Sequence, residues 1–547
     1  MILDENNKWT WIILFVIIAL GIFMHYKPYE YKLLHPYPTG IQSADANSRV
    51  SESEWIAENG QAYYQPSWFD DSKTNIIEND PPIALITSAM ISRITGLPAY
   101  DSLYFLSVLS IIGVGLVFFL IFWKIFHSIP MGLIAAILLI YPIEKMYHYQ
   151  ITIGMFPHVA ELMFLALTVL FFLKYMEDKL IVSLIGLALV FSFAFLSHSP
   201  TPTILMVLFS IIILYKIIRK EIPIKHFLIL NGIILVLTSL YIGVLLVNYF
   251  HIGQANTSGA GLSVSGKLFH DASSNPIKFM TFVNPVFYIL LLLGLASIIF
   301  YLKNKKYRYI VGMFLFMFCA TLLAAYFGVY HDHATDKSRY ALYLFAYPII
   351  AMGIYFLVKL VEQISKIKNL SIFVLLALFV LQIIMFNSIP KSSNSLMTQN
   401  SYDAYVWARE NIPKGNRILC LGCIQFEGLY AHRPIYLPTY ETDQNVINQI
   451  LEVSQNNYTQ GIIRSNIVGY SDERMYWDGI KMKTYGATPN VNHSICEFDY
   501  VLFKDLGQLT PMIFNIANKM IAKNNTLIYN SNNIAIIRNN FKDGECI

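Results

Sequence analysis

The chain has 547 residues, of which 55% are hydrophobic and only 14% are charged. Soluble domains carry about 25% charged residues, so this composition excludes an ordinary soluble protein and indicates an integral membrane protein. The net charge of +4 is spread along the chain without a basic block, which argues against a nucleic-acid partner.

The first apolar segment runs from Trp9 to about His25, "WTWIILFVIIALGIFMH". Its length is near the lower limit for a helix that crosses a bilayer. The sequence "FMHYKPYEYK" at its end offers no small-residue cleavage site. We therefore expect a retained membrane helix and not a cleaved signal peptide.

Further apolar runs follow along the rest of the first 390 residues. They lie at about 101–123, 130–146, 157–174, 180–197, 201–218, 226–250, 285–303, 308–329, 341–359 and 370–387. Together with the first run they predict about 11 transmembrane helices. The short gaps at 124–129, 175–179 and 304–307 predict antiparallel neighbours.

Lysine and arginine in the short loops predict the orientation, because cytoplasmic loops are enriched in these residues. With the N-terminus in the cytoplasm, fourteen of them fall in inner loops and five in short outer loops. We therefore predict a transmembrane domain at 1–387, with a long first outer loop at 26–100, and an extracytoplasmic domain at 388–547.

The C-terminal 160 residues predict a small α/β domain. "SYDAYVWARENIPKGNRILCLG" predicts a helix that is capped by Ser401 and ended by Pro413, followed by a buried strand. Later segments predict a helix around 443–455, a strand at 500–503, a helix at 511–523 and a hairpin at 526–539. The alternation of strands and helices favours an α/β layer fold.

Two cysteines in "CLGC", Cys420 and Cys423, favour structural thiols or a disulfide, with Cys496 as a possible partner outside the membrane. A redox motif or a zinc pair is the alternative, although we identify no partner ligands for it.

The first outer loop contains "SADANSRVSESEWIAENG", with Asp45 and Arg49 four residues apart. Ser51 and Glu54 form a capping-box pattern, and Gly60 is a typical helix stop. We expect Asp45 in a turn or first helical turn close to the membrane. A carboxylate there is costly without a partner, which favours a functional role.

A later part of this loop, "NDPPIALITSAMISRITGLP", places Asp80 before two prolines that suit the start of a helix. Asp80 is a candidate site residue, and an acid that only solvates the loop is the alternative.

The stretches "DANSRVSESEWIAENGQAYYQPSWFDD" and "DPPIALITSAMISRITGLP" resemble the first outer loop of oligosaccharyltransferase catalytic subunits and, more broadly, of GT-C membrane glycosyltransferases. The resemblance implies a polytopic helical GT-C-like fold. It also implies that Asp45, as the catalytic aspartate, helps to bind a divalent metal and the acceptor. Arg49 matches the arginine that follows this aspartate.

A second stretch, "DKSRYALYLFAYPIIAMGIYFL", is similar to the start of a late membrane helix in the same family. The resemblance implies that Arg339 contacts the phosphate of a lipid-linked donor. A guanidinium at the membrane boundary can bind phosphate through two hydrogen bonds while its stem lies on apolar surface. Ordinary headgroup anchoring is the alternative. "YVWARENIPKGNRIL" also looks like the opening of the family's exterior domain.

The chain departs from oligosaccharyltransferases at two motifs. Where the family carries an Asp-x-Glu pair, the sequence reads "ITIGMFPHVAEL", with His158 in place of an acid and Glu161 one helical turn later. The Trp-Trp-Asp signature that reads the asparagine sequon is not found after "RILCLGC". These departures favour an acceptor other than a sequon, or a chain that has lost catalysis.

Histidines on the outward side offer a substitute metal site. They are His148, His158, His198, His331 and His333. We expect a divalent metal, manganese or magnesium, with Asp45, His158 and Glu161 as ligands and with His331 and His333 as further candidates. Imidazole with carboxylate suits manganese, iron or zinc more than magnesium. Histidines hydrogen-bonded to headgroups or backbone are the alternative.

The function that these observations favour is transfer of a sugar or oligosaccharide from a polyprenyl-(di)phosphate donor to an acceptor on the outer side of the membrane. The expected partners are the bilayer and this lipid-linked donor, and the acceptor is unknown. Two other classes stay open: a non-catalytic scaffold or assembly subunit that displays 388–547, and a transporter.

Overall fold

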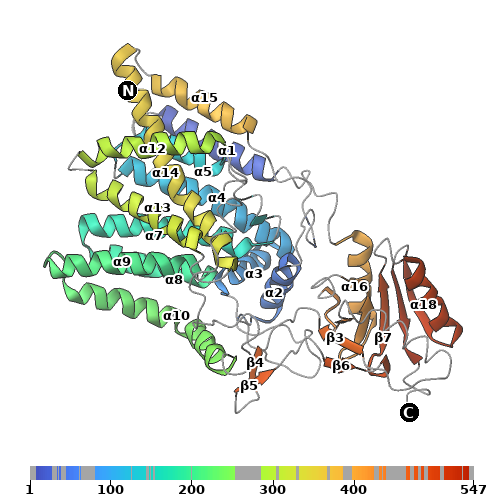
Figure 1. Cartoon of the computed structure of the whole chain (residues 1–547). Helices are drawn as coiled ribbons and strands as arrows, with labels where there is room; N and C mark the ends of the chain where they lie inside the picture. Colours follow the sequence, from blue (N-terminus) through green and yellow to red (C-terminus); the bar gives the residue numbers. More distant parts are fainter. Residues whose placement is uncertain are drawn as a thin grey trace.

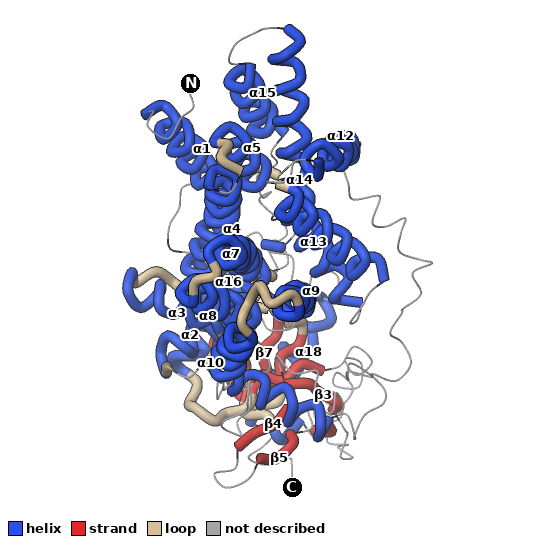
Figure 2. The backbone as a smooth tube through the Cα atoms, turned by 90° about the vertical axis from the view of Figure 1, so that its left-hand side faces the viewer, coloured by secondary structure: helices blue, strands red, loops and turns tan. Residues whose placement is uncertain are grey.

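The computed structural model describes residues 8–26, 45–60, 81–252, 285–327, 332–385, 397–438, 463–504 and 510–540, apart from short gaps inside these ranges, and a few isolated positions such as Tyr37. The helices gather into one elongated bundle, and a β-sheet with its own helices lies beside one end of it (Figure 1). Figure 2 shows the same arrangement from the side, with the strands at one end of the molecule.

The bundle is built from apolar helices that follow the hydropathy of the sequence. They are α1 (Lys8–Tyr26), α4 (Ala99–Lys124), α5 (Ile129–Ile140), α7 (Phe156–Asp178), α8 (Ile181–Ser197), α9 (Pro200–Ile218), α10 (Ile224–Ile252), α12 (Pro285–Lys303), α13 (Arg308–Phe327), α14 (Asp332–Ser365) and α15 (Leu370–Met385). In the described part of the chain, 6 helices are long and apolar enough to cross a membrane. This supports an integral membrane protein, while the count of 11 spans and the orientation of the termini remain predictions.

Burial separates inner from outer helices. In the apolar windows of α4, α7 and α14, 72%, 67% and 67% of the residues are buried, against 22–28% in α1, α10 and α12. The first three therefore form the centre of the bundle, and the others present apolar side chains outward, as helices that face lipid do.

Two helix boundaries differ from the sequence prediction. The run at 130–146 forms a helix only as far as Ile140, because Tyr141 caps it and Pro142 follows. The run at 341–359 belongs to a longer helix, α14, which already begins at Asp332 and continues through Pro348.

The predicted first outer loop contains α2 (Asp45–Asn59), and α3 (Ile83–Thr95) begins directly after two prolines. Asp45 is the first residue of α2, so its predicted place in a first helical turn is confirmed. The predicted capping box is wrong, since Ser51 is buried inside the helix. Gly60 ends α2 as predicted, with φ +71° and its N–H donating to the carbonyl of Ile56.

The C-terminal elements form what we call the sheet module, residues 399–540. Its helices are α16 (Gln399–Asn411) and α18 (Thr510–Ala522), and a 3-10 turn, η5, covers Ile495–Glu497. Its main sheet has the order β6-β3-β2-β1-β7-β9-β8. The strands are β1 (Ile418–Leu421), β2 (Ile435–Pro438), β3 (Ile463–Ile467), β6 (Val491–His493), β7 (Tyr500–Lys504), β8 (Thr526–Ser531) and β9 (Ile534–Arg538), with β4 (Arg474–Trp477) and β5 (Met482–Tyr485) paired separately.

Within the sheet, β1 runs parallel to both β2 and β7, and the outer pairs are antiparallel. The predicted strand at 500–503, the helix at 511–523 and the closing hairpin are confirmed. The cap of α16 is Thr398, whose hydroxyl accepts from the N–H of Ser401, and not Ser401 itself. The predicted helix at 443–455 lies outside the described residues.

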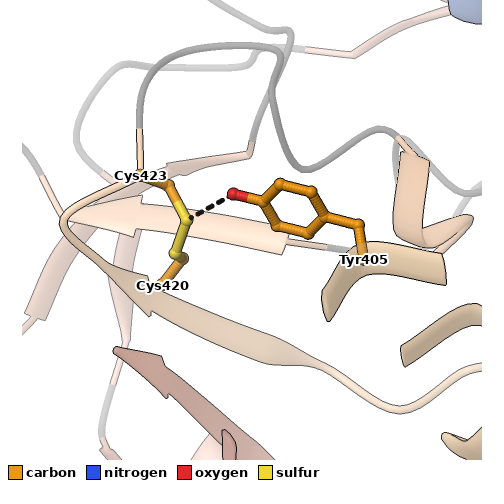
Figure 3. Close-up of a disulfide and its surroundings, with 3 residues drawn as sticks. All are labelled: Tyr405, Cys420 and Cys423. Carbon is orange, nitrogen blue, oxygen red and sulfur yellow. Dashed lines mark hydrogen bonds between the residues drawn. A yellow bond between two sulfur atoms is a disulfide. The ribbon is translucent and has the colours of Figure 1, made fainter. Parts of the chain in front are cut away.

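A disulfide joins Cys420, at the end of β1, to Cys423, which confirms the expected structural disulfide and pairs the two cysteines with each other and not with Cys496. Gly422, with φ +87°, turns the chain back between the two cysteines. The hydroxyl of Tyr405, on α16, lies 3.2 Å from Sγ of Cys423 (Figure 3). The Tyr405 hydroxyl thus links α16 to the disulfide at the end of β1.

Candidate functional site

A buried cluster of two histidines and a glutamate lies where the start of α7 meets the end of α8. His158 and Glu161 are three residues apart near the start of α7, so they share one helix face. His198 follows the last residue of α8 in an extended conformation. Because α7 and α8 are antiparallel neighbours joined by a short turn at Lys179, the end of α8 returns to the start of α7.

The three side chains meet at one carboxylate oxygen. Oε2 of Glu161 lies 2.8 Å from Nδ1 of His198 and 3.3 Å from Nε2 of His158. One potential ligand atom from each residue lies within 4.8 Å of the other two. His158 and Glu161 are 1% and 0% exposed, so the carboxylate is shielded from solvent by protein. This set offers two nitrogens and one oxygen to a metal ion.

The start of α2 packs against the turn that leads into α7. Gly154 has φ +78°, and a Cβ built on it would lie 2.5 Å from the backbone nitrogen of Ala46. Only glycine permits both this conformation and this approach. Ala46 follows Asp45 directly, so the fold brings the backbone of Asp45 beside the chain that carries His158. The side chain of Asp45 is outside the described set.

The structure describes the remaining predicted site residues only in part. Arg49 lies one turn after Asp45 on α2 and forms an ion pair of 3.3 Å with the largely buried Glu52. Arg339 and His333 lie in the first turns of α14, but their side chains are not described. Asp80 and His331 lie outside the described residues.

The contribution of His198 is new relative to the predicted ligand set. The sequence places His198 on the outward side but does not pair it with Glu161. A signal was available, because the short gap at 175–179 predicts antiparallel helices, and these bring the end of the second helix, with His198, back beside the start of the first.

Comparison with known proteins identifies the architecture. No family model matches the chain, and no curated protein matches it by sequence. ArnT from Cupriavidus metallidurans, solved with undecaprenyl phosphate, matches with a TM-score of 0.54 and 9% identity, over 97% of this chain and 98% of that chain. The chain shares the fold of ArnT along nearly its whole length.

The oligosaccharyltransferase of Archaeoglobus fulgidus also matches the fold of this chain. Its complex with Zn and sulfate matches at a TM-score of 0.52 and 12% identity, over 92% of this chain and 69% of that chain. Its apo form matches at 0.51 and 11% identity, over 79% of this chain and 64% of that chain. This chain thus spans less than two thirds of the archaeal enzyme in this match. These likenesses confirm the resemblance predicted from the first outer loop.

Proposed function

We propose that this chain is a membrane glycosyltransferase that transfers a sugar from a polyprenyl phosphate or diphosphate to an acceptor on the outer side of the membrane. The observation that carries the proposal is the buried cluster of His158, Glu161 and His198 in a GT-C bundle, beside the helix that begins at Asp45. The lipid-phosphate donor is supported by ArnT, which matches over nearly its whole length and was solved with undecaprenyl phosphate.

The cluster fits a divalent metal. A buried carboxylate costs several kcal/mol of desolvation unless positive charge compensates for it. Two imidazoles and one carboxylate form a ligand set with room for a further ligand, as in catalytic zinc sites. This set suits manganese, iron or zinc and disfavours magnesium. The archaeal relative solved with Zn and sulfate agrees with this preference. A bound cation would supply positive charge to the leaving phosphate.

The protein residues then have separate roles. During transfer the bond between the anomeric carbon and the phosphate oxygen breaks, and the acceptor nucleophile forms a bond to that carbon and releases its proton to a base. Asp45 is our candidate for this base, because α2 begins beside the turn before α7. Arg339 and Arg49 are our candidates for binding the phosphate oxygens through charge-assisted hydrogen bonds.

The acceptor is proposed to differ from an asparagine sequon, because the sequence lacks the Trp-Trp-Asp signature after "RILCLGC". A scaffold that displays the sheet module would not require a donor lipid. Activity therefore separates the two functions.

The test is release of polyprenyl phosphate or diphosphate from the matching sugar-loaded lipids by the purified full chain in proteoliposomes, with Mn²⁺ present and with water as the nucleophile that accepts the sugar. We expect the wild type to consume at least one donor of the panel, and Glu161→Gln to be at least about 100-fold slower. The matched control is Glu177→Gln, an exposed glutamate at the other end of α7, which should keep full activity. Equal rates for Glu161→Gln and the wild type would overturn the proposed site.

A further inference from the structure

The sheet module contacts α2 close to Asp45, through residues distant in sequence. The hydroxyl of Tyr430 donates to Oδ1 of Asn47 over 3.3 Å, across 383 positions of the chain. Tyr430 and Asn47 are each 2% exposed, so the hydrogen bond is shielded from water. A buried hydrogen bond of this kind fixes the orientation of α2 relative to the sheet module, because water cannot replace either partner.

A second contact holds the opposite half of α2. Glu54, on the third turn of this helix, contacts two basic side chains of the sheet module. Nη1 of Arg409, on α16, lies 3.9 Å from one carboxylate oxygen, and Nε2 of His432 lies 3.6 Å from the other. The Tyr402 hydroxyl, also on α16, has a pKa raised by burial and then by the negative charge of Glu54. The helix is thus held at two points about two turns apart.

The segment that supplies Tyr430 and His432 is itself fixed to α16. The guanidinium of Arg433 donates to the carbonyl oxygens of Ile412 and Arg409 at 2.7 Å each, and to that of His432 at 2.8 Å. Arg433 is only 7% exposed, and burial lowers the pKa of its guanidinium. The aromatic ring of Tyr402 packs against that of Tyr430, with centroids 5.6 Å apart. The contacting groups therefore form a rigid surface.

The first turn of α2 has a second neighbour, the turn at Gly154 in the bundle. Ala46 packs against Gly154 within van der Waals range, while the next residue, Asn47, is bonded to Tyr430. Figure 1 shows α2 between the bundle and α16. The start of α2 is therefore enclosed by the sheet module and by the chain that leads to His158.

We propose that the sheet module is a positioning element for the site, in which Tyr430 and Arg409 hold the first turn of α2, which begins at Asp45, against the turn that leads to His158. The inference rests on the proposed function for what Asp45 does there, but the mechanical claim stands on the contacts alone. Tyr430 and Arg409 are positioning residues, because they act on the site through Asn47 and Glu54. A small displacement of a catalytic group costs a large factor in rate, so this contact would set turnover and leave donor affinity unchanged.

The first experiment measures the position of α2 directly. Spin labels at two exposed positions, Glu58 on α2 and Lys174 on α7, report the distance between the helix and the bundle in the full chain. Tyr430→Phe combined with Glu54→Gln should broaden or shift the distance distribution. The control, Tyr529→Phe in the same module, should leave it unchanged. An unchanged distribution in the double variant would overturn the proposal.

The second experiment measures the rate. Tyr430→Phe and Arg409→Glu should each lower kcat about 10-fold, with KM for the donor within about twofold of the wild-type value. Glu54→Arg in the Arg409→Glu background should restore most of kcat, which a loss of folding would not allow. Unchanged kcat in both single variants would overturn the positioning role. A shifted distance distribution with no transfer by the wild type would instead reject the proposed function and leave the contact between module and helix established.

Discussion

Replacing Glu161 with glutamine tests the proposed metal site most sharply. The substitution keeps the shape of the side chain and removes the one anionic ligand of the described cluster. Glu161 is fully buried, so its charge is weakly screened by solvent. Loss of a residue that only supports a metal ligand weakens binding about 10- to 100-fold, and loss of the ligand itself should reach at least about 100-fold.

This factor converts into a measurable stability difference. At an Mn²⁺ concentration of about 100 times Kd, binding stabilises the wild type by about 2.7 kcal/mol. A variant whose Kd is about 100-fold higher is half-saturated at the same concentration and gains only about 0.4 kcal/mol. The metal-dependent stabilisation should therefore fall by about 2.3 kcal/mol.

The assay is a titration in detergent that follows the electron paramagnetic resonance signal of free Mn²⁺, together with unfolding measured with and without the ion. Glu177→Gln serves as the control on the same helix. Wild-type affinity in Glu161→Gln, or an equal loss in both variants, would refute the assignment of this cluster as a metal centre.

Three further predictions follow from the packing. Gly154→Ala should lower the free energy of unfolding by about 1–3 kcal/mol and abolish transfer, because φ is +78° and the new methyl group meets the backbone of Ala46. The control is Gly232→Ala, where a new methyl group has nothing within 4 Å. Equal unfolding free energies for the two variants would contradict the prediction. Gly294→Ala should cost more than about 2 kcal/mol by forcing α12 away from Ile349 on α14, whereas Gly312→Ala, also in open space, should not; denaturation of both variants checks it. Cys423→Ser should lower the stability of the chain by only about 2 kcal/mol, since the disulfide closes a very short loop, and a loss of more than about 5 kcal/mol on denaturation would contradict that reasoning.

The sequence predicts the helices of the bundle well because hydropathy acts locally. Each predicted apolar run overlaps a helix, with boundary differences at α5 and α14, since every such segment must satisfy its own backbone hydrogen bonds. The failures at Ser401 and Ser51 have a different cause. Thr398 supplies an earlier cap for α16, and contacts of α2 with α3 and α4 favour a helix that begins at Asp45. Tertiary packing overrides a local capping pattern here.

The candidate site was predicted in part. His158 and Glu161 are visible in the sequence, because their spacing of three places them on one helix face. The pairing of Glu161 with His198 depends on how two helices pack, and the sheet order depends on strand contacts between distant segments. The contact of Tyr430 with Asn47 joins two segments that are 383 positions apart, and no local pattern in either segment indicates the other.

The central claim is that one outward-facing site contains the His158–Glu161–His198 metal centre, the carboxylate of Asp45 and the guanidinium of Arg339. The most direct measurement is anomalous diffraction at the manganese edge, from crystals grown with Mn²⁺ and a polyprenyl phosphate. We predict a manganese peak among His158, Glu161 and His198, with the carboxylate of Asp45 beside it and Arg339 on the lipid phosphate. A manganese peak elsewhere, or a phosphate bound away from Arg339 on another flank of the bundle, would contradict the account.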